Sequence, residues 1–327
     1  MFRFIIKRLL ILIPTILGVA FLVTLFITLT PGDPVELMCG PDVSAEEKAA
    51  MREEMGLNDP FFIRYVHFLN GVIHGDLGNS YRTGKPVVKE MVQRFPYTLL
   101  LVASSMILSL IVGIPVGIYA AVHQYSWKDN LAIFLCLFFV SMPSFWFALL
   151  LVRLLSVKWK LLPVAGVESW TGWILPVIIS SLTHIASIAR QTRSNMLEVI
   201  RQDYITTARA KGCSERTVRY RHALKNAIIP VIMIVGTTFG VSLGGSMVFE
   251  QIFSIPGLGI YSLSAMSGRD YPVIQASVLF QSTMFAVVLL LIDVAFAIVD
   301  PRIRVQYAAR RKKKKAAPKP EAESAAA

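Results

Sequence analysis

Charged residues are scarce in this sequence. Only 17% of its 327 residues are Asp, Glu, Lys or Arg, whereas 54% are hydrophobic. Soluble domains typically contain about 25% charged residues. The shortage of charge therefore excludes an ordinary soluble domain and indicates a protein that lies largely within a membrane.

Cysteine is also rare, with three residues in the whole chain. The assignment of membrane spans given below places Cys39 in an outer loop, Cys136 within a span and Cys213 in an inner loop. No two of these thiols lie on the same aqueous side. The sequence therefore predicts neither an internal disulfide framework nor a metal site.

Some motifs for covalent chemistry are missing as well. The chain contains no HExxH and no CxxC, which mark zinc peptidases and thiol or metal chemistry. The stretch Gly78–Lys85 does not match a phosphate-binding loop, because five residues separate its glycines instead of four and Pro86 follows the lysine. We therefore expect no enzyme, no catalytic, cofactor-binding or metal-binding residues, and no nucleotide site within this chain.

What the sequence does contain is six long apolar segments. Each is long enough to cross the hydrocarbon region, which needs about 20 helical residues. The predicted spans are Leu9–Leu29, Thr98–Val122, Leu131–Val152, Ser169–Ala189, Asn226–Phe249 and Tyr271–Val299. The first five contain no Asp, Glu, Lys or Arg, and the sixth contains only Asp293. The sequence therefore predicts an all-α integral membrane protein with six transmembrane helices, the first of which is too long for a cleaved signal peptide.

The net charge of +12 is unevenly distributed along the chain. Basic residues dominate the N-terminus, the stretch 190–225 and the segment 300–327, whereas acidic residues outnumber basic ones ten to seven in 31–97. With six spans, all the basic regions fall on one side of the membrane, which the positive-inside rule assigns to the cytoplasm. This pattern predicts a multi-pass inner-membrane protein with both termini in the cytoplasm, and it argues against nucleic acid as a partner.

The sequence divides into four parts. Residues 1–30 form the N-terminal segment and the first span, and 31–97 form an extracytoplasmic loop domain with a capping box at Ser44 and Glu47. Residues 98–300 form a core of spans two to six that contains the basic loop 196–225. Residues 301–327 form a basic tail, which we expect to be disordered and to bind anionic membrane lipid.

The basic loop between spans four and five predicts a helix–glycine–helix unit. Apolar residues from Met196 to Ala208 recur at helical spacing, Gly212 follows as a helix end, and Ser214 is positioned to cap a second helix. Its positive charge places the unit in the cytoplasm. Two interpretations remain open: a solvated positive loop, or a docking element that presents a defined knob to a cytoplasmic partner.

Small and polar residues inside the spans allow two interpretations each. Gly236, Gly240 and Gly244 form one smooth stripe, which either packs against a neighbouring helix or leaves room for a solute. Asp293 is either a functional group or a structural bond to a neighbouring element. His184 is either a proton relay or a side chain that bonds a neighbouring helix or faces a partly wet interior.

Helix-breaking residues follow the fifth span. Glu250 ends the span, and Pro256, Gly257 and Gly259 then interrupt the helix. Non-helical backbone at membrane depth is tolerated only against protein or a water-filled path. We therefore expect a re-entrant segment at the outer mouth of a translocation route.

Short motifs are distributed along the chain: RLL near the start, then PGDP, GDLG, TARAKG, PGLG, RDYP and DPRIR. Together they resemble the permeases of binding-protein-dependent ABC importers, in particular the dipeptide and oligopeptide branch. The resemblance implies that the basic loop is a coupling loop that contacts a separate ATPase. The broad family pattern has Glu-Ala-Ala where this chain has Thr206-Thr207-Ala208, so the acidic residue and its salt bridge are not carried over. The expected coupling residues are Tyr204, Thr206, Thr207, Ala208, Arg209, Ala210, Lys211 and Gly212.

The resemblance also implies partners and a solute. We expect a second homologous permease subunit, two ATP-binding subunits and an extracytoplasmic solute-binding protein, with the solute passing between the two permeases. Short peptides are the expected solute, and glutathione, nickel chelates or oligosaccharides are alternatives. The residues expected at the path or its gate are Gly240, Gly244, Glu250, Pro256, Gly257, Gly259 and Asp293.

Two other classes of function are weaker interpretations. An ion-driven secondary transporter typically shows internal repeats and intramembrane charges, whereas this sequence shows one acidic residue inside its spans and no repeat. A membrane scaffold or receptor would use the basic loop only to recruit a partner. The helix-breaking outer segment and the glycine stripe disfavour a scaffold.

Overall fold

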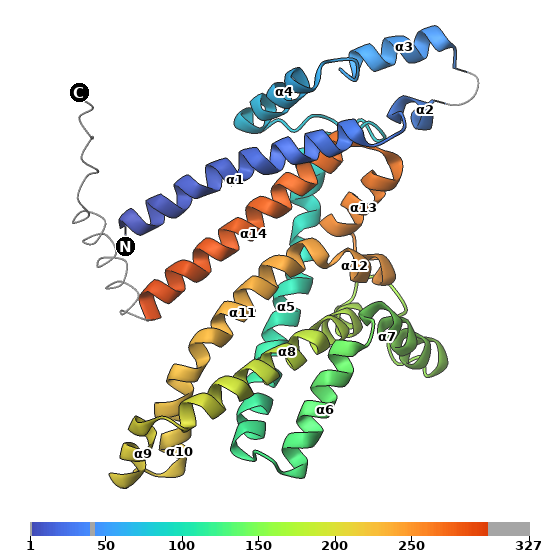
Figure 1. Ribbon diagram of the computed structural model, residues 1–327. Coiled ribbons are helices and arrows are strands. Elements are labelled where there is room, and N and C mark those ends of the chain that lie inside the picture. The colour runs from blue at the N-terminus through green and yellow to red at the C-terminus, as the bar shows by residue number, and fades with distance from the viewer. Residues whose placement is uncertain (1, 40–42, 300–327) are drawn as a thin grey trace, which may run out of the picture.

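The structure is a computed structural model that describes residues 2–39 and 43–299 (Figure 1). Its described residues are helical or lie in turns and loops, and their one strand-like pairing is an isolated bridge between Asn79 and Pro86. This confirms the predicted all-α fold. The predicted basic tail 301–327 lies outside the described residues.

One long helix and three short ones form the first part of the chain. They are α1 (Phe2–Leu29), α2 (Pro34–Met38), α3 (Ala45–Glu54) and α4 (Phe61–His74). Helix α3 begins with the predicted capping box, in which the Glu47 N–H donates to Ser44 Oγ at 3.2 Å and the Ser44 N–H donates to Glu47 Oε2 at 3.0 Å. These two bonds satisfy backbone donors that a helix start otherwise leaves unpaired.

The core contains the remaining helical segments. They are α5 (Val87–Val122), α6 (Trp127–Ser141), α7 (Ser144–Leu151), the π-helix η1 (Val152–Lys158), the 3-10 helix η2 (Trp170–Trp173), α8 (Ile174–Ile200), α9 (Asp203–Ala210), α10 (Glu215–Thr217), the π-helix η3 (Val218–Ala223), α11 (Leu224–Gly245), α12 (Met247–Phe253), α13 (Leu258–Gly268) and α14 (Tyr271–Val299). Five helical segments are long and apolar enough to cross a membrane, and a sixth span results if α6 and the α7–η1 segment count as one.

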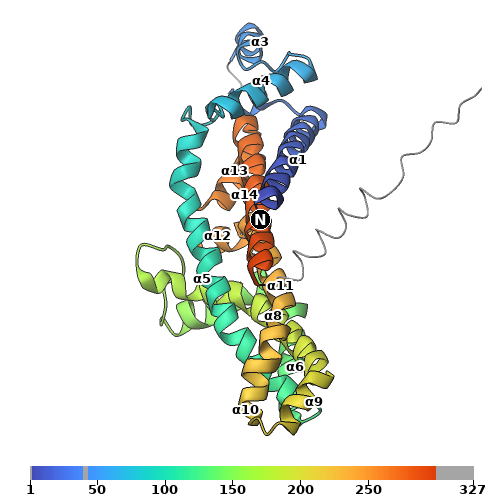
Figure 2. The same ribbon diagram turned by 90° about the vertical axis from the view of Figure 1, so that its left-hand side faces the viewer.

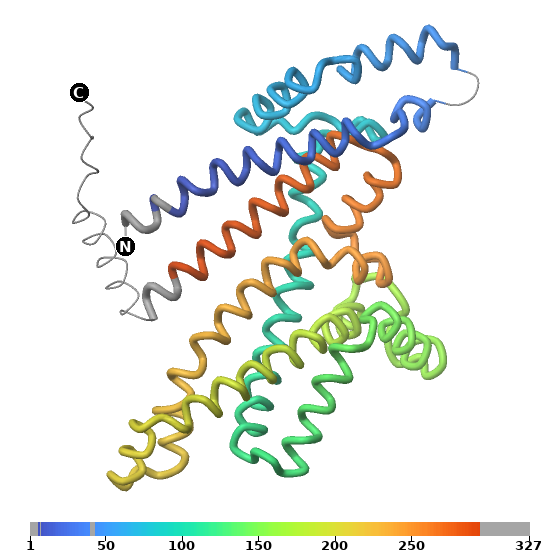
Figure 3. The backbone as a smooth tube through the Cα atoms, viewed as in Figure 1, coloured from blue at the N-terminus to red at the C-terminus, as the bar shows by residue number. Residues whose placement is uncertain are grey.

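The third predicted span, Leu131–Val152, is not one straight helix. Helix α6 ends at Ser141, and the next helical segment continues at an angle of 98° to it (Figure 3). Pro143 explains the break, because proline lacks a backbone N–H and disfavours a helical conformation at the preceding residue. Met142 accordingly adopts an extended conformation with a ψ of 135°.

The helix boundaries around the basic loop also differ from the prediction. The apolar residues from Met196 to Ala208 belong to two helices, because α8 continues to Ile200 and the extended backbone of Gln202 separates it from α9. The second helix of the unit runs from Glu215 into the fifth span without a gap. Helix α5 begins at Val87, eleven residues before the predicted start of the second span.

The two ends of the molecule are formed by different parts of the chain. Figures 1 and 2 place α3 and α4 at one end, and α9 and α10 at the opposite end, with the long helices between them. Helices α1, α14 and α11 lie side by side (Figure 1). Many large apolar side chains on the long helices are exposed, among them Leu10, Phe26 and Ile111 at 59%, 63% and 65%, as a lipid-facing surface requires.

Helices α5 and α8 pack against each other closely because of two glycines. A Cβ atom on Gly117 would lie 2.5 Å from the carbonyl oxygen of Ala189, and one on Gly113 would lie 3.0 Å from that of Ile185. Any larger residue would separate the two backbones. Since α8 leads into α9, this contact joins the basic loop to the second span.

Candidate functional site

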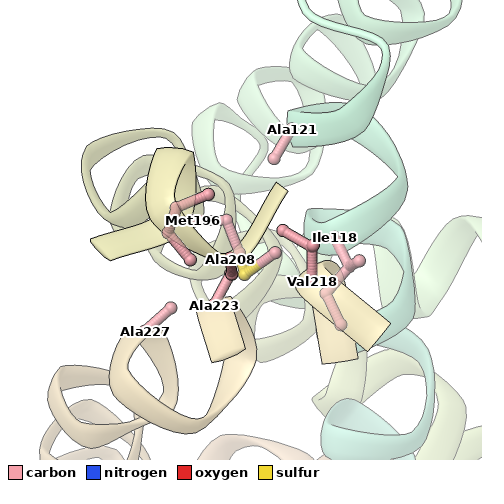
Figure 4. Close-up of a cluster of buried hydrophobic side chains, with 8 residues drawn as sticks. Ile118, Ala121, Met196, Ala208, Val218, Ala223 and Ala227 are labelled. Atoms are coloured by element: carbon pink, nitrogen blue, oxygen red, sulfur yellow. The ribbon is translucent and has the colours of Figure 1, made fainter. Parts of the chain in front are cut away.

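The basic loop folds into a compact unit, here called the inner bend, which comprises residues 201–217. Its buried side is an apolar cluster shared with α5, α8, η3 and α11 (Figure 4). Ile205 of α9 is fully buried there. The buried members of the cluster are Ile118, Ala121, Met196, Ile205, Ala208, Val218, Ala223 and Ala227. The inner bend is therefore fixed to three spans by apolar packing.

The turn at the tip of the inner bend has the predicted helix-ending glycine and the predicted N-cap serine. Gly212 has a φ of +79°, and a Cβ atom placed on it would meet nothing within 4 Å. The Gly212 N–H donates to the Arg209 carbonyl at 2.9 Å and the Cys213 N–H to the Ala208 carbonyl at 3.2 Å, which satisfies the last carbonyls of α9. Ser214 Oγ accepts from the Thr217 N–H at 3.4 Å and caps the next helix.

Most of the expected coupling residues are exposed on this unit. They are Tyr204, Thr206, Thr207, Arg209, Ala210, Lys211 and Gly212. Ala208 is the exception, because only 8% of its surface is exposed and it lies among Met196, Val218 and Ala223 (Figure 4). This burial fits the place of Ala208 in the apolar pattern of the sequence, and the side chain anchors α9 to the spans.

Two polar contacts hold the exposed face in place. Tyr204 Oη accepts a hydrogen bond from Asn226 Nδ2 at 2.8 Å, which ties α9 to the start of the fifth span. Arg209 Nε lies 2.8 Å from Glu215 Oε1, which ties α9 to α10. The exposed surface is thus a short, defined knob with basic residues at its tip.

At the other end of α11, residues 246–270 form what we call the outer bend, which contains α12 and α13. Glu250 is fully buried there. Its carboxylate accepts hydrogen bonds from Thr98 Oγ1 at 2.6 Å, from Ser246 Oγ at 2.8 Å and from the Ile260 N–H at 2.8 Å. Among the described residues none forms an ion pair with it, so Glu250 acts as a hydrogen-bonded clamp between α5, α12 and α13.

The two glycines of the PGLG motif allow this clamp to close. A Cβ atom on Gly257 would lie 2.5 Å from Glu250 Oε1, and one on Gly259 would lie 2.8 Å from the Cα atom of Met247. Glu250, Gly257 and Gly259 are therefore brought together, but they lie within packed protein rather than on a surface. Pro256, which directly precedes Gly257, is exposed and lines a cavity of about 520 Å³.

A second buried carboxylate, Asp270, fixes the far end of α13, and the expected site residues do not include it. Asp270 is 3% exposed and accepts hydrogen bonds from Ser80 Oγ at 2.5 Å and from the Tyr81 N–H at 3.0 Å. It belongs to the RDYP motif, and its partners follow the GDLG motif in the outer loop. These two motifs are the sequence feature from which the contact of Asp270 with the outer loop could have been predicted.

Near Asp270, Arg94 lies 4.8 Å from the ring centre of Tyr261, and burial raises the pKa of Tyr261 to about 12.

Three other expected path residues line a groove between α1, α11 and α14. Gly240, Gly244 and Asp293 border this groove, which has a volume of about 550 Å³. Asp293 Oδ2 lies 3.0 Å from Arg8 Nη2 of α1, so this carboxylate makes a structural bond to a neighbouring helix. A Cβ atom on Gly240 would lie 2.5 Å from the Phe285 ring, so this part of the glycine stripe packs against α14.

His184 of α8 also bonds a neighbouring helix, since its Nε2 lies 3.3 Å from Ser242 Oγ of α11. Its Nδ1 is buried without a hydrogen-bond partner in the described part of the chain. The described residues therefore show no second group to which His184 could pass a proton.

Gly240–Gly244 matches the GxSxG pattern of hydrolases around Ser242, but it lies within a helix rather than at a strand-to-helix turn. In residues 2–39 and 43–299, no group of three potential metal ligands occurs.

Comparisons with known proteins agree with the organisation described above. Residues 113–305 match the family of binding-protein-dependent transport system inner membrane components, and residues 1–102 match the N-terminal family of the same membrane components. A glutathione transport system permease of Salmonella typhimurium is 42% identical over 304 residues, covering 93% of this chain and 99% of that relative. A dipeptide transport system permease of Escherichia coli K12 is 41% identical over 336 residues, with the same coverage.

A solved structure shows a related fold. The inward-facing MetNI methionine ABC transporter superposes with a TM-score of 0.53 and 16% identity, covering 64% of this chain and 96% of that one. The family matches extend over most of the sequence, and the relatives are similar from end to end. The chain therefore belongs to the inner-membrane components of binding-protein-dependent transport systems, in the branch of ABC importer permeases that includes the dipeptide and glutathione systems.

Proposed function

We propose that this chain is the permease subunit of an ATP-driven importer for short peptides, and that the inner bend is where the ATPase acts. The observation that carries this proposal is the inner bend itself: a rigid, basic knob whose exposed side holds Arg209, Ala210 and Lys211 and whose buried side packs on the spans. A solvated loop would need no buried anchor. The chain itself performs no chemistry, and ATP is hydrolysed by partner subunits.

The coupling proposed here is mechanical. When the two ATP-binding subunits close, they displace α9 and α10. Because Ile205 and Ala208 are buried against α5, α8 and η3, and packed interiors transmit displacement rather than absorb it, the spans tilt with the inner bend. Access to the path between this chain and a second homologous permease then changes from outward to inward.

The proposed topology follows from the same assignment. The inner bend and both termini lie in the cytoplasm, and α2, α3 and the outer bend lie on the extracytoplasmic side, where a solute-binding protein delivers the solute. The positive-inside distribution of charge supports this orientation. The separation of α9 and α10 from α3, at opposite ends of the molecule in Figures 1 and 2, is compatible with this topology.

Site-specific cross-linking in the assembled transporter tests the coupling role. A photoreactive residue at Ala210, which is exposed on α9, should capture the ATP-binding subunit in inner-membrane vesicles. The same residue at Ala50, which is exposed on α3, is the matched control and should not capture it. Capture from Ala50 but not from Ala210 would refute both the orientation and the coupling role.

The solute is tested separately. Glutathione and dipeptide permeases resemble this chain equally well, at 42% and 41% identity, so glutathione import by the same machinery is the second candidate. Uptake of a labelled dipeptide into proteoliposomes should require ATP and the solute-binding protein, and unlabelled dipeptide should compete better than glutathione. Uptake driven by an ion gradient without ATP would instead indicate a secondary transporter.

A further inference from the structure

Helix α4 of the outer loop domain lies along the first span. Phe61 and Tyr65 pack edge-to-face against Phe21 of α1, with ring centres 5.2 and 5.6 Å apart. Tyr65 Oη also donates a hydrogen bond to the carbonyl oxygen of Leu17 at 3.1 Å. These contacts fix α4 against α1 rather than leaving it in the water beyond the end of the span.

The depth of α4 follows from the position of its contacts on α1. Leu17 lies twelve residues before the end of that helix, a distance of about 18 Å along a helix axis. The hydrocarbon region of a bilayer is about 30 Å thick. Since α1 crosses the membrane, Tyr65 and the turn that carries it lie beside the apolar part of the span. With its 14 residues, α4 is too short to cross the bilayer itself and has the length of an interfacial or re-entrant segment.

A second face of α4 is apolar and uncovered. Phe62, Val66 and Ile73 are 71%, 59% and 80% exposed, and their spacing together with Leu69 places them in one stripe along the helix. If α4 were surrounded by water, this contiguous apolar stripe would expose an unfavourably large apolar area to solvent. The neighbouring α3 shows the contrast, because six of its ten residues carry charged side chains.

The third face of α4 carries the polar residues together with one large apolar residue, Ile63, and its one cation points along the span. It holds Arg64, His67 and His74, and Arg64 Nη1 lies 3.5 Å from Thr28 Oγ1 near the end of α1. A long cationic side chain that lies at membrane depth reaches toward the nearest interface in this way. One packed face, one bare apolar face and one polar face are what an amphipathic helix in the plane of the interface requires.

We propose that α4 is an interfacial membrane helix whose stripe Phe62–Val66–Leu69–Ile73 contacts lipid acyl chains. In the proposed topology these chains belong to the outer leaflet. The outer loop domain is then part aqueous and part lipid-embedded: α3 projects into water, and α4 holds the domain to the bilayer beside the first span. The occupant of the stripe is lipid because the contacts with Leu17 and Phe21 set its depth.

Spin labels on α4 test the assignment in the full-length chain, assembled with its partner subunits in lipid nanodiscs. Labels are attached to cysteines at Val66 and Ile73 on the stripe, and at His67 and Asn70 as matched controls one to three residues away. The three native cysteines are first replaced. We expect the Val66 and Ile73 labels to collide several-fold more often with oxygen than with a water-soluble nickel chelate, and the His67 and Asn70 labels to show the reverse.

Each alternative occupant gives a different result, and each would overturn the proposal. Equal access of the nickel chelate to all four labels would place α4 in water. Loss of nickel access to Val66 and Ile73 only after the solute-binding protein is added would make the stripe a protein-docking surface. Shielding of both labels from oxygen and nickel without that protein would mean that the second permease covers it. If the cysteine variants fail to assemble, Phe62→Trp combined with brominated lipids provides the second measurement, in which quenching of the added fluorescence supports lipid contact and its absence overturns it.

Discussion

The inner and outer bends both reverse the chain between long helices, yet different forces hold them. The inner bend rests on an apolar cluster around Ile205 and Ala208, and its turn needs only one residue with positive φ, Gly212. The outer bend is held by two buried carboxylates, Glu250 and Asp270, which receive hydrogen bonds from distant parts of the chain. Burial of apolar surface holds the inner bend in place, whereas directional hydrogen bonds hold the outer bend.

This difference indicates which end can move. Apolar contacts are not directional, so the inner bend stays packed while it tilts as a unit. Separating a buried carboxylate from its hydrogen-bond donors raises the free energy of the folded chain steeply, because both groups are left without partners. Helix α13 is therefore held in one position relative to α5. We infer that the inner bend transmits motion and that the outer bend is a fixed point about which the spans rearrange.

The largest effect is expected from Glu250→Ala. The substitution leaves the hydroxyls of Thr98 and Ser246 and the Ile260 N–H without their acceptor, and each buried donor without a partner costs about 1–3 kcal/mol. We expect most of the assembled transporter to be lost, measured as the amount of complex recovered in mild detergent and its thermal stability. Glu168→Ala is the control, because Glu168 is an exposed acidic residue on the same side of the membrane in the proposed topology. Equal recovery of both variants would contradict the fixed outer bend.

A slightly smaller loss is expected from Gly257→Ala. Gly257 has a φ of −89° and a ψ of −178°, which any residue adopts, so the cost is purely steric. The new Cβ atom would lie 2.5 Å from Glu250 Oε1 and would push the carboxylate from its donors. We expect reduced assembly and a lower melting temperature than in Gly166→Ala, where a Cβ atom meets nothing within 4 Å but φ is +87°. If Gly166→Ala is the more damaging variant, backbone strain rather than close approach decides stability at this end.

Comparison of the two bends also shows which features the sequence could predict. The turn at Gly212, the cap at Ser214 and the capping box at Ser44 were predictable because each depends on residues within a few positions. The enclosure of Glu250 was not, since its donor Thr98 is 152 residues away. The division of the apolar pattern from Met196 to Ala208 between two helices was not predictable either, because the extended backbone at Gln202 separates residues whose spacing fits one helix.

The prolines within the spans show a similar limit to what the sequence predicts about the shape of each helix. Pro143 breaks the third span, whereas Pro14, Pro115 and Pro230 lie inside continuous helices. Membrane helices tolerate proline where neighbouring groups satisfy the freed carbonyls. Whether a proline bends a span therefore depends on tertiary packing, which a single sequence does not reveal, and the positions of the spans were more predictable than their shapes.

An intermediate effect is expected from a matched pair in the inner bend, Ala208→Leu and Ala210→Leu. The two alanines lie on the same helix, but the Ala208 side chain is buried, with 8% of its surface exposed, whereas Ala210 is exposed to solvent. Added bulk in a packed site costs about 1–3 kcal/mol, so Ala208→Leu should lower the melting temperature of the complex and Ala210→Leu should not. Ala210→Leu should instead weaken association with the ATP-binding subunit, measured by co-purification. The reverse assignment of the two effects would show that α9 is oriented differently on the spans.

The smallest effect on stability, and the most informative for coupling, is expected at Gly212. Space is open around this residue, so a substitution acts only through its φ of +79°. A β-branched residue is strained there, and the left-handed conformation costs roughly 1–2 kcal/mol for ordinary residues, whereas Asn tolerates it. We expect Gly212→Val to insert and assemble normally but to lose solute uptake and solute-stimulated ATP hydrolysis, and Gly212→Asn to retain both. Because the tip of the inner bend contributes little to the fold, a loss confined to Val would show that the shape of this turn, and not the stability of the chain, couples the ATPase to the spans. Full uptake by Gly212→Val would mean that the tip is not the surface on which the ATPase acts.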